Sequence, residues 1–388
     1  MRLSDCHSID DLEKLARRRL PHPVYQYLIG AAETEATARR NIASFDEVRL
    51  IPRCLIDVSQ VDTKTRILGQ DVAWPVFCSS TGASRFYHPE GERAVARAAA
   101  KSGTLYSLSV AGTTSLEAIA AESSGPKMFQ LFIFKDRGLT RSLLERCRQA
   151  KYPAVCLTVD AAVRGKRERE LRSGMGVPPK LSWRTMASMA LQLPWSLGQW
   201  RKGPLSLANV AAHAKPGNFA EQSKQFGALL DPAVSWADLA DVIKQWNGPF
   251  AIKGILSGED ARRAADIGAT AVIISNHGGR QLDGAASPFD VLPQIAAAVG
   301  GRVELILDGG IRRGVHVLKA LALGANACSI GRAYLFGLAA GGEAGVARAL
   351  EILKSELIRA MQLCGCVDLK AIDRELVDGR AFAFVSGS

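Results

Sequence analysis

The stretch Ile273-Ile274-Ser275-Asn276-His277-Gly278-Gly279-Arg280-Gln281-Leu282-Asp283 decides how the rest of the chain is interpreted. An apolar run ends there in a histidine, two glycines and an arginine. A buried strand with this ending delivers a titratable base and a fixed cation to one point, and its glycines allow a tight turn and the close approach of a ligand. A single such motif is usually only a histidine in a turn, so its companions along the chain decide the interpretation.

Seven other short apolar runs lie on both sides of the strand predicted over Ala271–Ser275. Helical patterns separate several of them, at Gly91–Ser102, Ser115–Ala121, Asp260–Ile267 and Val315–Leu323. Each run is rich in Val, Ile, Leu, Phe or Cys, which is typical of strands buried on both faces. The runs are Val76–Ser79, Thr104–Leu108, Met128–Phe134, Ala154–Val159, Phe250–Lys253, Val303–Leu307 and Ala327–Ile330. Eight strand–helix units predict an α/β fold of the (β/α)8 TIM-barrel type.

A doubly wound parallel sheet is the alternative fold for such a pattern. Dinucleotide-binding sheets of that class carry GxGxxG, and the chain has no such sequence. Its one GxG, at Gly174-Met175-Gly176, continues into Pro178-Pro179. The barrel is therefore the favoured architecture.

The spacing of the predicted strands is uneven after the fourth. Phe250 follows Asp160 by 90 positions, far more than one barrel helix occupies, so we predict an insertion over residues 171–230. Residues before Val76 are expected to form a helical segment, and those after Ala339 a closing helix with a loose tail at Val385–Ser388. The 388 residues could hold two average domains or one large barrel, and we predict a single domain over 1–388.

The net charge of +11 is concentrated in one segment. Between Leu171 and Lys215 there is no Asp or Glu, but there are three of the six tryptophans, Trp183, Trp195 and Trp200. The six basic residues of the segment are Arg172, Lys180, Arg184, Arg201, Lys202 and Lys215. We predict that residues 171–215 dock on an anionic membrane without crossing it. An active-site lid or a subunit contact is the alternative, and the localised charge argues against a nucleic-acid binder.

The cysteines and the N-terminus indicate the compartment. Eight cysteines are scattered without CxxC or metal-ligand spacing, so we expect free thiols, a reducing compartment and no metal site. Met1–Leu20 has no apolar core of signal-peptide length, and no apolar run reaches the roughly 20 residues of a spanning helix. We expect a cytoplasmic protein bound peripherally to the inner face of the cell membrane.

Polar residues cluster where the predicted strands end, which in a barrel is one common mouth. The last two clusters, Asp308-Gly309-Gly310 and Gly331-Arg332, follow strands 7 and 8, the usual place of a phosphate site. The others are Ser79-Ser80-Thr81-Gly82, Ser109, Gln130, Thr158 with Asp160, Lys253-Gly254, and His277 with Arg280. We expect the active site at this mouth.

These motifs carry a family resemblance. The pieces TVD (158–160), KG (253–254), SNHGGRQLDG (275–284), LDGGIRRG (307–314) and IGRAYLFGLA (330–339), with HPEGE (88–92), resemble the FMN-dependent L-2-hydroxy-acid oxidases and dehydrogenases. The likeness runs in order from Leu20 to about Leu369 and is nearest in type to the membrane-associated dehydrogenases. It implies that FMN is the cofactor and that an L-2-hydroxy acid, L-lactate or a bulkier or aromatic one, is oxidised to the 2-oxo acid. It further implies a quinone-type membrane acceptor and a homotetramer.

The resemblance also assigns roles to individual residues. His277 would be the base that takes the substrate proton, with Asp160 pairing with the imidazolium. Arg280 and Arg167 would bind the substrate carboxylate, for which a guanidinium fork is suited, with a hydroxyl from Tyr27. Lys253 would stabilise the reduced cofactor. The remaining FMN contacts would come from Ser80, Thr81, Gly82, Ser109, Gln130, Thr158, Ser275, Asp308, Gly309, Gly310, Arg312, Gly331 and Arg332.

Three positions depart from the family pattern. Phe132, in QLFIF, replaces the usual tyrosine, Ala111 replaces a tryptophan, and Gly82 is a further small pocket position. The smaller side chains suggest substrates bulkier than glycolate. Ser79-Ser80-Thr81 replaces Ala-Pro-Thr in a flavin-contacting loop. The motifs leave open an oxidase that uses oxygen and a non-catalytic flavin-binding protein that lacks the QLY tyrosine.

Overall fold

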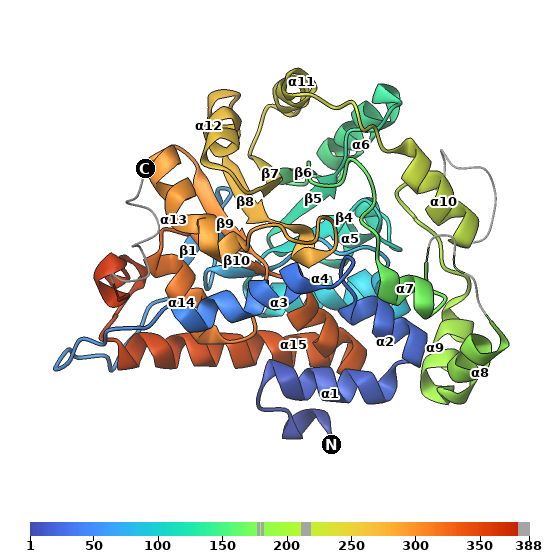
Figure 1. The fold of residues 1–388 in the computed structure, drawn as a ribbon, viewed down its shortest axis with the longest axis horizontal. Coiled ribbons are helices and arrows are strands. Elements are labelled where there is room, and N and C mark those ends of the chain that lie inside the picture. Colours follow the sequence, from blue (N-terminus) through green and yellow to red (C-terminus); the bar gives the residue numbers. More distant parts are fainter. Residues whose placement is uncertain (177–178, 180–181, 211–218, 379–388) are drawn as a thin grey trace.

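The computed structural model describes residues 1–176, 179, 182–210 and 219–378. Its centre is a closed barrel of parallel strands in the order β10-β3-β4-β5-β6-β7-β8-β9 (Figure 1). The strands are β3 (Val76–Cys78), β4 (Tyr106–Ser109), β5 (Lys127–Leu131), β6 (Ala154–Thr158), β7 (Phe250–Ile255), β8 (Ala271–Ser275), β9 (Glu304–Asp308) and β10 (Ala327–Ile330). The predicted (β/α)8 barrel is confirmed.

The barrel has an apolar interior that is closed at its amino-terminal end. Inward-facing side chains such as Phe77, Met128, Ile273 and Ile306 are almost completely buried there. The antiparallel hairpin of β1 (Thr65–Ile67) and β2 (Gln70–Val72) adds buried apolar residues to the same cluster. A packed interior excludes ligands from this end, so the open carboxyl ends of the strands are left for chemistry.

Helices surround the barrel, and several begin at side-chain caps. Ser115, Ser235, Ser257 and Ser287 each accept a backbone N–H from the first turn of the following helix, which stabilises that turn. The surrounding helices are α4 (Gly91–Lys101), α5 (Leu116–Glu122), α6 (Arg137–Gln149), α11 (Trp236–Trp246), α12 (Gly258–Asp266), α13 (Pro288–Val299), α14 (Gly314–Ala322) and α15 (Arg332–Leu363). The closing helix α15 is kinked at Gly341 and Gly342, where the backbone leaves helical geometry.

The segment before the barrel is helical, as predicted. It contains α1 (Ile9–Arg19), α2 (His22–Ile29) and α3 (Ala36–Ala43), followed by the 3-10 turn η2 (Ser44–Glu47). The α1 helix packs against α15 at the lower side of the molecule in Figure 1. The α3 helix contacts the η5 turn (His277–Gly279), so the N-terminal segment reaches the carboxyl ends of β8 and β9.

The insertion after the fourth barrel strand contains α7 (Glu168–Arg172), α8 (Trp183–Leu191), α9 (Leu193–Lys202) and α10 (Phe219–Leu229). Figure 1 shows α8 and α9 projecting at one corner, away from the barrel. Among the described residues, Arg172 pairs with Glu168 at 2.5 Å and Lys202 with Glu90 at 3.0 Å. Lys180, Lys215 and the side chain of Arg184 lie outside the described part of the chain.

Element boundaries differ little from the prediction. The β5 strand ends at Leu131 and not at Phe134, because Phe134 forms an isolated antiparallel bridge with Leu230 of the insertion. The predicted tail at Val385–Ser388 lies outside the described residues. Among the helices that the structure describes, none combines the length and the apolar content needed to cross a bilayer.

Candidate active site

Strand register brings the predicted polar residues to one level at the carboxyl end of the barrel. Ser109 is paired with Gln130 across β4 and β5, Thr158 with Lys253 across β6 and β7, and Ser275 with Asp308 across β8 and β9. Because neighbouring strands are parallel, these side chains form a ring around the mouth. Ser109 Oγ donates to Gln130 Oε1 at 2.9 Å, so the polar groups also bind one another.

Lys253 is held in a buried network at this level. Its Nζ donates to Ser275 Oγ at 2.6 Å and forms an ion pair with Asp308. Asp308 also accepts hydrogen bonds from Ser275 Oγ at 2.7 Å and Ser329 Oγ at 2.5 Å. Burial by itself lowers the pKa of Lys253, but the carboxylates of Asp308 and Asp160 outweigh it and hold that pKa above its ordinary value. The ammonium therefore keeps its charge, and two bonds leave it a third N–H for a ligand.

His277 lies beside Asp160, as the sequence predicts. Its Nδ1 is 3.0 Å from Asp160 Oδ1, and its side chain is 29% exposed, so the opposite ring nitrogen is within reach of a ligand. The other carboxylate oxygen, Asp160 Oδ2, is buried without a hydrogen-bond partner among the described residues. His277 itself has a left-handed backbone, with φ at +60°, a conformation that few residues other than glycine adopt.

The two predicted carboxylate-binding arginines lie on either side of a third charged residue. Glu170, on α7, is 2.6 Å from Arg280 Nη2 and 3.4 Å from Arg167 Nη1, and it also pairs with Arg164 at 2.7 Å. Three guanidiniums thus share one buried carboxylate, which leaves an excess of positive charge. Burial, together with the nearby charge of Arg280, lowers the pKa of Arg167 to about 10. An arriving carboxylate would relieve both effects.

Arg280 retains free donors in this arrangement. Its Nη1 donates to the carbonyl oxygens of Tyr27, at 3.1 Å, and Gly30, at 2.5 Å, while one Nη2 hydrogen goes to Glu170. A guanidinium has five N–H groups, so the Nε edge and one Nη2 hydrogen have no partner among the described residues. The same guanidinium lies 5.2 Å from the centre of the Tyr27 ring, which places Tyr27 at the arginine pair.

The two small pocket positions, Gly82 and Ala111, lie together, and Phe132 contacts an aromatic residue of the insertion. Ala83 N donates to Ala111 O at 3.0 Å, and a Cβ on Gly82 would lie 3.3 Å from Ala111 Cβ. The Phe132 ring packs edge-on against Phe226 of α10, with centroids 6.1 Å apart. The small residues Gly82 and Ala111 thus lie on two adjoining loops. The insertion contributes an aromatic side chain, Phe226, on the Phe132 side.

The charge at the ends of β9 and β10 fits an anionic cofactor. Arg332 donates to the carbonyl oxygens of Leu28, Gly278 and Gly30, at 3.3, 2.9 and 2.9 Å. Burial and repulsion by Arg280 and Arg312 lower the pKa of Arg332 to about 9, and burial lowers that of Arg312. Gly309 and Gly310, which closely precede Arg312 in the chain, have φ angles of +131° and +77°. Clustered cations next to glycine N–H groups are the donor set that a phosphate requires.

The remaining loop of the predicted flavin site is fixed by a tyrosine. Thr81 Oγ1 lies 2.6 Å from Tyr334 Oη, which donates to Ser79 O at 2.9 Å. Tyr334 stands in the IGRAYLFGLA piece and was not singled out from the sequence. Its bonds give the Ser79-Ser80-Thr81 variant of this loop a defined anchor.

Glu170, Ser329 and Phe226 also belong to the site and were not predicted from the sequence. Glu170 is one of several acidic and basic residues in Lys166–Arg172, and nothing local marks it as buried. Ser329 could have been found, because period-two alternation in β10 points it into the barrel at the level of Asp308. Phe226 belongs to the insertion, whose path over the mouth no local pattern predicts.

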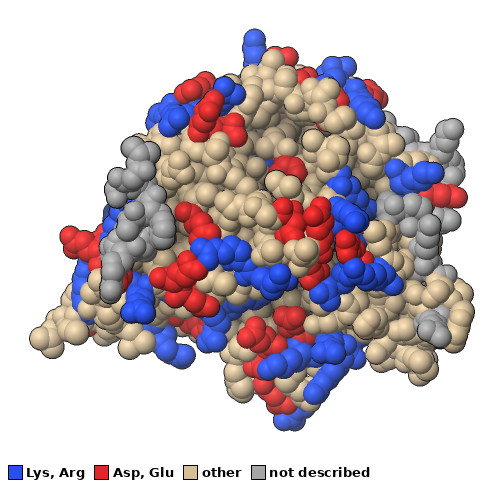
Figure 2. Space-filling model, in the orientation of Figure 1, with Lys and Arg blue, Asp and Glu red and all other residues tan. Residues whose placement is uncertain are grey.

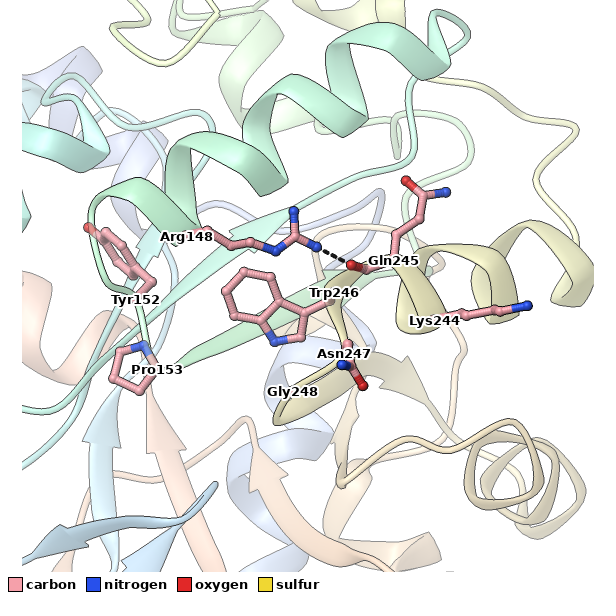
Figure 3. Close-up of a pocket in the computed structure, with 8 residues that line it drawn as sticks. All are labelled: Arg148, Tyr152, Pro153, Lys244, Gln245, Trp246, Asn247 and Gly248. Carbon is pink, nitrogen blue, oxygen red and sulfur yellow. Dashed lines mark hydrogen bonds between the residues drawn. The ribbon is translucent and has the colours of Figure 1, made fainter.

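The large open depression in Figure 3 is a separate feature. It has a volume of about 700 Å³ and includes Tyr152 and Pro153, just before β6, and Asn247 and Gly248, just before β7. These are the amino ends of the strands, so the depression lies at the opposite end of the barrel from His277. The Arg148 guanidinium lies 5.7 Å from the Trp246 ring centre there.

Comparison with known proteins gives one consistent result. A sequence profile of the family described as FMN-dependent dehydrogenase matches residues 16–379. A curated L-lactate oxidase from Nostoc sp. (strain PCC 7120) is 44% identical over 94% of this chain and 95% of its own. A curated L-lactate dehydrogenase from Caulobacter vibrioides is 41% identical over 96% and 98%.

A solved structure agrees with the sequence matches. The crystal structure of the monotopic membrane protein (S)-mandelate dehydrogenase superposes with a TM-score of 0.92 at 36% identity, covering 96% of this chain and 99% of the other. The likeness therefore includes both the barrel and the insertion after its fourth strand.

Proposed function

This chain belongs to the FMN-dependent dehydrogenase family, and from that premise we propose that it oxidises an L-2-hydroxy acid to the 2-oxo acid at the mouth of its barrel. The observation that carries the proposal is that one loop holds both His277, paired with Asp160, and, three residues further on, the partly buried guanidinium of Arg280. A base and a carboxylate-binding cation on one loop suit a substrate whose hydroxyl and carboxylate are on adjoining carbons.

We propose that FMN is held by the ring of polar residues and by the basic glycine loops. Ser80, Thr81, Gly82, Ser109, Gln130, Thr158, Lys253 and Ser275 would bind the flavin ring, and Asp308, Gly309, Gly310, Arg312, Gly331 and Arg332 its ribityl chain and phosphate. When bound, FMN supplies the two-electron acceptor that side chains lack. Lys253 would offset negative charge on the reduced cofactor, since its network keeps it protonated.

His277 is proposed to take the proton of the substrate through its exposed ring nitrogen. Asp160 would hold Nδ1 protonated and stabilise the imidazolium. Arg280 and Arg167 would bind the carboxylate with the donors that Glu170 and the backbone leave over, and Tyr27 would add its hydroxyl. Glu170 keeps the two guanidiniums apart and oriented before substrate arrives.

The substrate side chain is proposed to be apolar and larger than that of glycolate. Gly82 and Ala111 leave space on one side, and Phe132 offers a ring without a hydroxyl. L-Lactate and aromatic 2-hydroxy acids such as mandelate both fit this description. The names of the relatives span the same range.

A membrane quinone is the proposed electron acceptor, reached from a docking surface on α8 and α9. The large apolar side chains Trp183, Met186, Leu191, Leu193, Leu197 and Trp200 are between 51% and 81% exposed. Figure 2 shows the corner formed by these helices as mostly uncharged. Interfacial helices bury such a face in the headgroup layer without spanning the bilayer. We expect a homotetramer bound to the inner membrane face.

Oxygen is the second candidate acceptor, favoured by the L-lactate oxidase among the relatives. Both candidates use the same site residues, and only the fate of the electrons separates them.

A substrate panel on the purified holoenzyme tests the proposal. Glycolate, L-lactate and (S)-mandelate are each supplied with a quinone-like dye and, in parallel, with oxygen. We expect L-lactate or (S)-mandelate to be preferred to glycolate, faster turnover with the dye, and FMN as the flavin identified by mass. No flavin reduction by any 2-hydroxy acid, or FAD as the cofactor, contradicts the proposal.

A further inference from the structure

The loop that carries His277 has a strained backbone. His277, Gly278 and Gly279 have consecutive φ angles of +60°, +65° and +74°. A non-glycine residue in this region is strained and persists only where its surroundings fix it. Other contacts must hold this backbone, because the 3.0 Å contact with Asp160 fixes the imidazole and not the main chain.

A side-chain tie to this loop comes from α3, more than 230 residues earlier in the chain. Asn41 Nδ2 donates to Asn276 Oδ1 at 2.8 Å, and Asn276 Nδ2 donates to Asn41 Oδ1 at 2.7 Å. Both side chains are at least 95% buried. Asn276 Oδ1 also accepts Gly279 N at 3.0 Å, so the amide pair closes around the turn that positions His277.

Asn41 also contacts the glycine loop after β9. A Cβ on Gly310 would overlap the carbonyl oxygen of Asn41, and a Cβ on Gly309 would lie 3.5 Å from Asn41 Nδ2. Glycine is required there because α3 passes directly over the loop. Asn41 thus contacts the His277 loop through its side-chain amide and the glycine loop through its backbone, and the amide lies near Gly309.

Other contacts also join α3 and the residues before it to the His277 loop. Ala32 N donates to Gly279 O at 2.8 Å, and a Cβ on Gly279 would lie 2.6 Å from Ala38 N. Asp283 accepts Thr34 N at 3.0 Å and Thr37 N at 2.9 Å, and so caps the start of α3 from the far end of the loop. The helix is therefore bonded to this loop near its start, through Asp283, and near its end, through Asn41.

We propose that Asn41 is a positioning residue that fixes the His277 loop and the glycine loop relative to each other, and so couples base alignment to cofactor binding. The part concerning His277 rests on the proposed function. Arg280 is held independently by Glu170 and by the carbonyl oxygens of Tyr27 and Gly30, so loss of Asn41 moves the base and leaves the carboxylate site in place.

Asn41→Ala and Asn276→Ala test the coupling in two measurements. Displacement of a catalytic group by about 1 Å can cost 100-fold in rate, so we expect kcat per bound flavin to fall about 10- to 100-fold in both variants, with KM changed less than about threefold. Titration of the apoprotein with FMN, followed by flavin fluorescence, should show about tenfold weaker binding for Asn41→Ala alone. Asn276→Ala leaves the glycine loop contacts of Asn41 and serves if Asn41→Ala does not fold.

Ser44→Ala is the matched control. Ser44 follows α3, is 1% exposed, and loses two buried side-chain bonds, the 3.0 Å contact with Ser287 Oγ and the 3.4 Å bond to the carbonyl oxygen of Asn41, neither of which involves the Asn41 side-chain amide. It should lower the melting temperature much as the other variants do and leave kcat and FMN affinity unchanged. Unchanged kcat in Asn41→Ala, or an equal loss in Ser44→Ala, overturns the proposal. A parent enzyme that oxidises no hydroxy acid refutes the proposed function, while the FMN titration still decides the role of Asn41.

Discussion

The His277 side chain pairs with Asp160, and contacts from α3, outside its own loop, hold its backbone. The 3.0 Å contact with Asp160 sets which ring nitrogen faces the ligand, because Nδ1 is already engaged. General-base catalysis by a histidine requires both this orientation and a position within hydrogen-bond reach of the substrate. The side chain itself is therefore the first place to test the mechanism.

Replacing His277 with Gln should keep a hydrogen-bonding side chain and remove the base. We expect kcat with the preferred hydroxy acid to fall about 10²- to 10⁴-fold while FMN stays bound. Steady-state rates normalised to flavin absorbance measure this. A His277→Gln enzyme with full turnover and full FMN content contradicts the assignment of the base.

Phe132→Tyr adds a single hydroxyl oxygen to the proposed substrate pocket. A neutral hydrogen bond is worth about 0.5–1.5 kcal/mol, which is up to about tenfold in rate, so Phe132→Tyr should change kcat or substrate preference by that factor or less. The ring contact with Phe226 is kept in the variant. Identical kinetics for glycolate, L-lactate and (S)-mandelate in both enzymes would show that this position does not face the substrate.

At the scale of elements, the local apolar pattern predicted the strands that are buried on both faces. It did not predict the path of the insertion, which packs against other segments. The β8 and β10 strands have the predicted bounds because their apolar residues have no solvent face to interrupt the run. The insertion follows no such rule. Trp195 was expected at the membrane with Trp183 and Trp200, but its indole donates to Phe86 O at 2.8 Å and packs inward.

The candidate site divides in the same way. His277 and Arg280 were predictable because the sequence itself delivers them to the end of a strand. Glu170 and Asn41 were not, since each acquires its role from a contact with a residue more than 100 positions away. A sequence pattern predicts which strand carries a side chain. The Glu170–Arg280 and Asn41–Asn276 contacts depend instead on how separate elements pack together.

The exposed faces of α8 and α9 should control membrane binding. Burying a leucine or tryptophan stabilises by roughly 1.5–3 kcal/mol, so Leu191→Ser with Trp200→Ser should weaken binding to anionic vesicles at least about tenfold and leave dye-linked turnover unchanged. Vesicle sedimentation measures this. Leu363→Ser is the control, since Leu363 is 70% exposed at the end of α15, outside the insertion. Equal loss in the control excludes a specific docking face.

The capping of α3 by Asp283 should make stability depend on pH. Burial would raise the pKa of Asp283, but hydrogen bonds from Thr34 and Thr37 outweigh it and lower that pKa. A carboxyl with a lowered pKa stabilises the fold above its unfolded pKa of about 3.9, and that stability is lost as the pH falls towards the folded value. Asp283→Asn should cost about 1 kcal/mol at pH 7 and less at about pH 3.5.

Melting temperatures of the two proteins at the two pH values measure this difference. Asp266→Asn is a suitable control, because Asp266 forms only a surface ion pair with Arg302 at 2.6 Å. A melting difference for Asp283→Asn that is the same at both pH values rules out the ionised cap as its cause.

At the scale of the whole molecule, the projecting corner is fastened to the rim of the barrel mouth. Trp195 and Gln199 donate to carbonyl oxygens of the turn at Phe86 and Arg85, and Arg85 in turn donates to the carbonyl oxygens of Lys202 and Gly203, at 3.1 and 2.9 Å. The Phe86 ring lies 5.9 Å from that of Tyr27. A lipid surface in contact with α9 would therefore lie beside the opening used by the substrate.

If a membrane quinone accepts the electrons, as we propose, this attachment implies that the two reactants arrive from different phases, the hydroxy acid from water and the quinone by lateral diffusion in lipid. The rate should then follow the mole fraction of quinone in the bilayer and not its bulk concentration. At a fixed amount of a quinone analogue, added phospholipid should slow turnover by surface dilution, with the KM for the hydroxy acid unchanged. A rate indifferent to added lipid would mean that the acceptor is delivered through the aqueous phase.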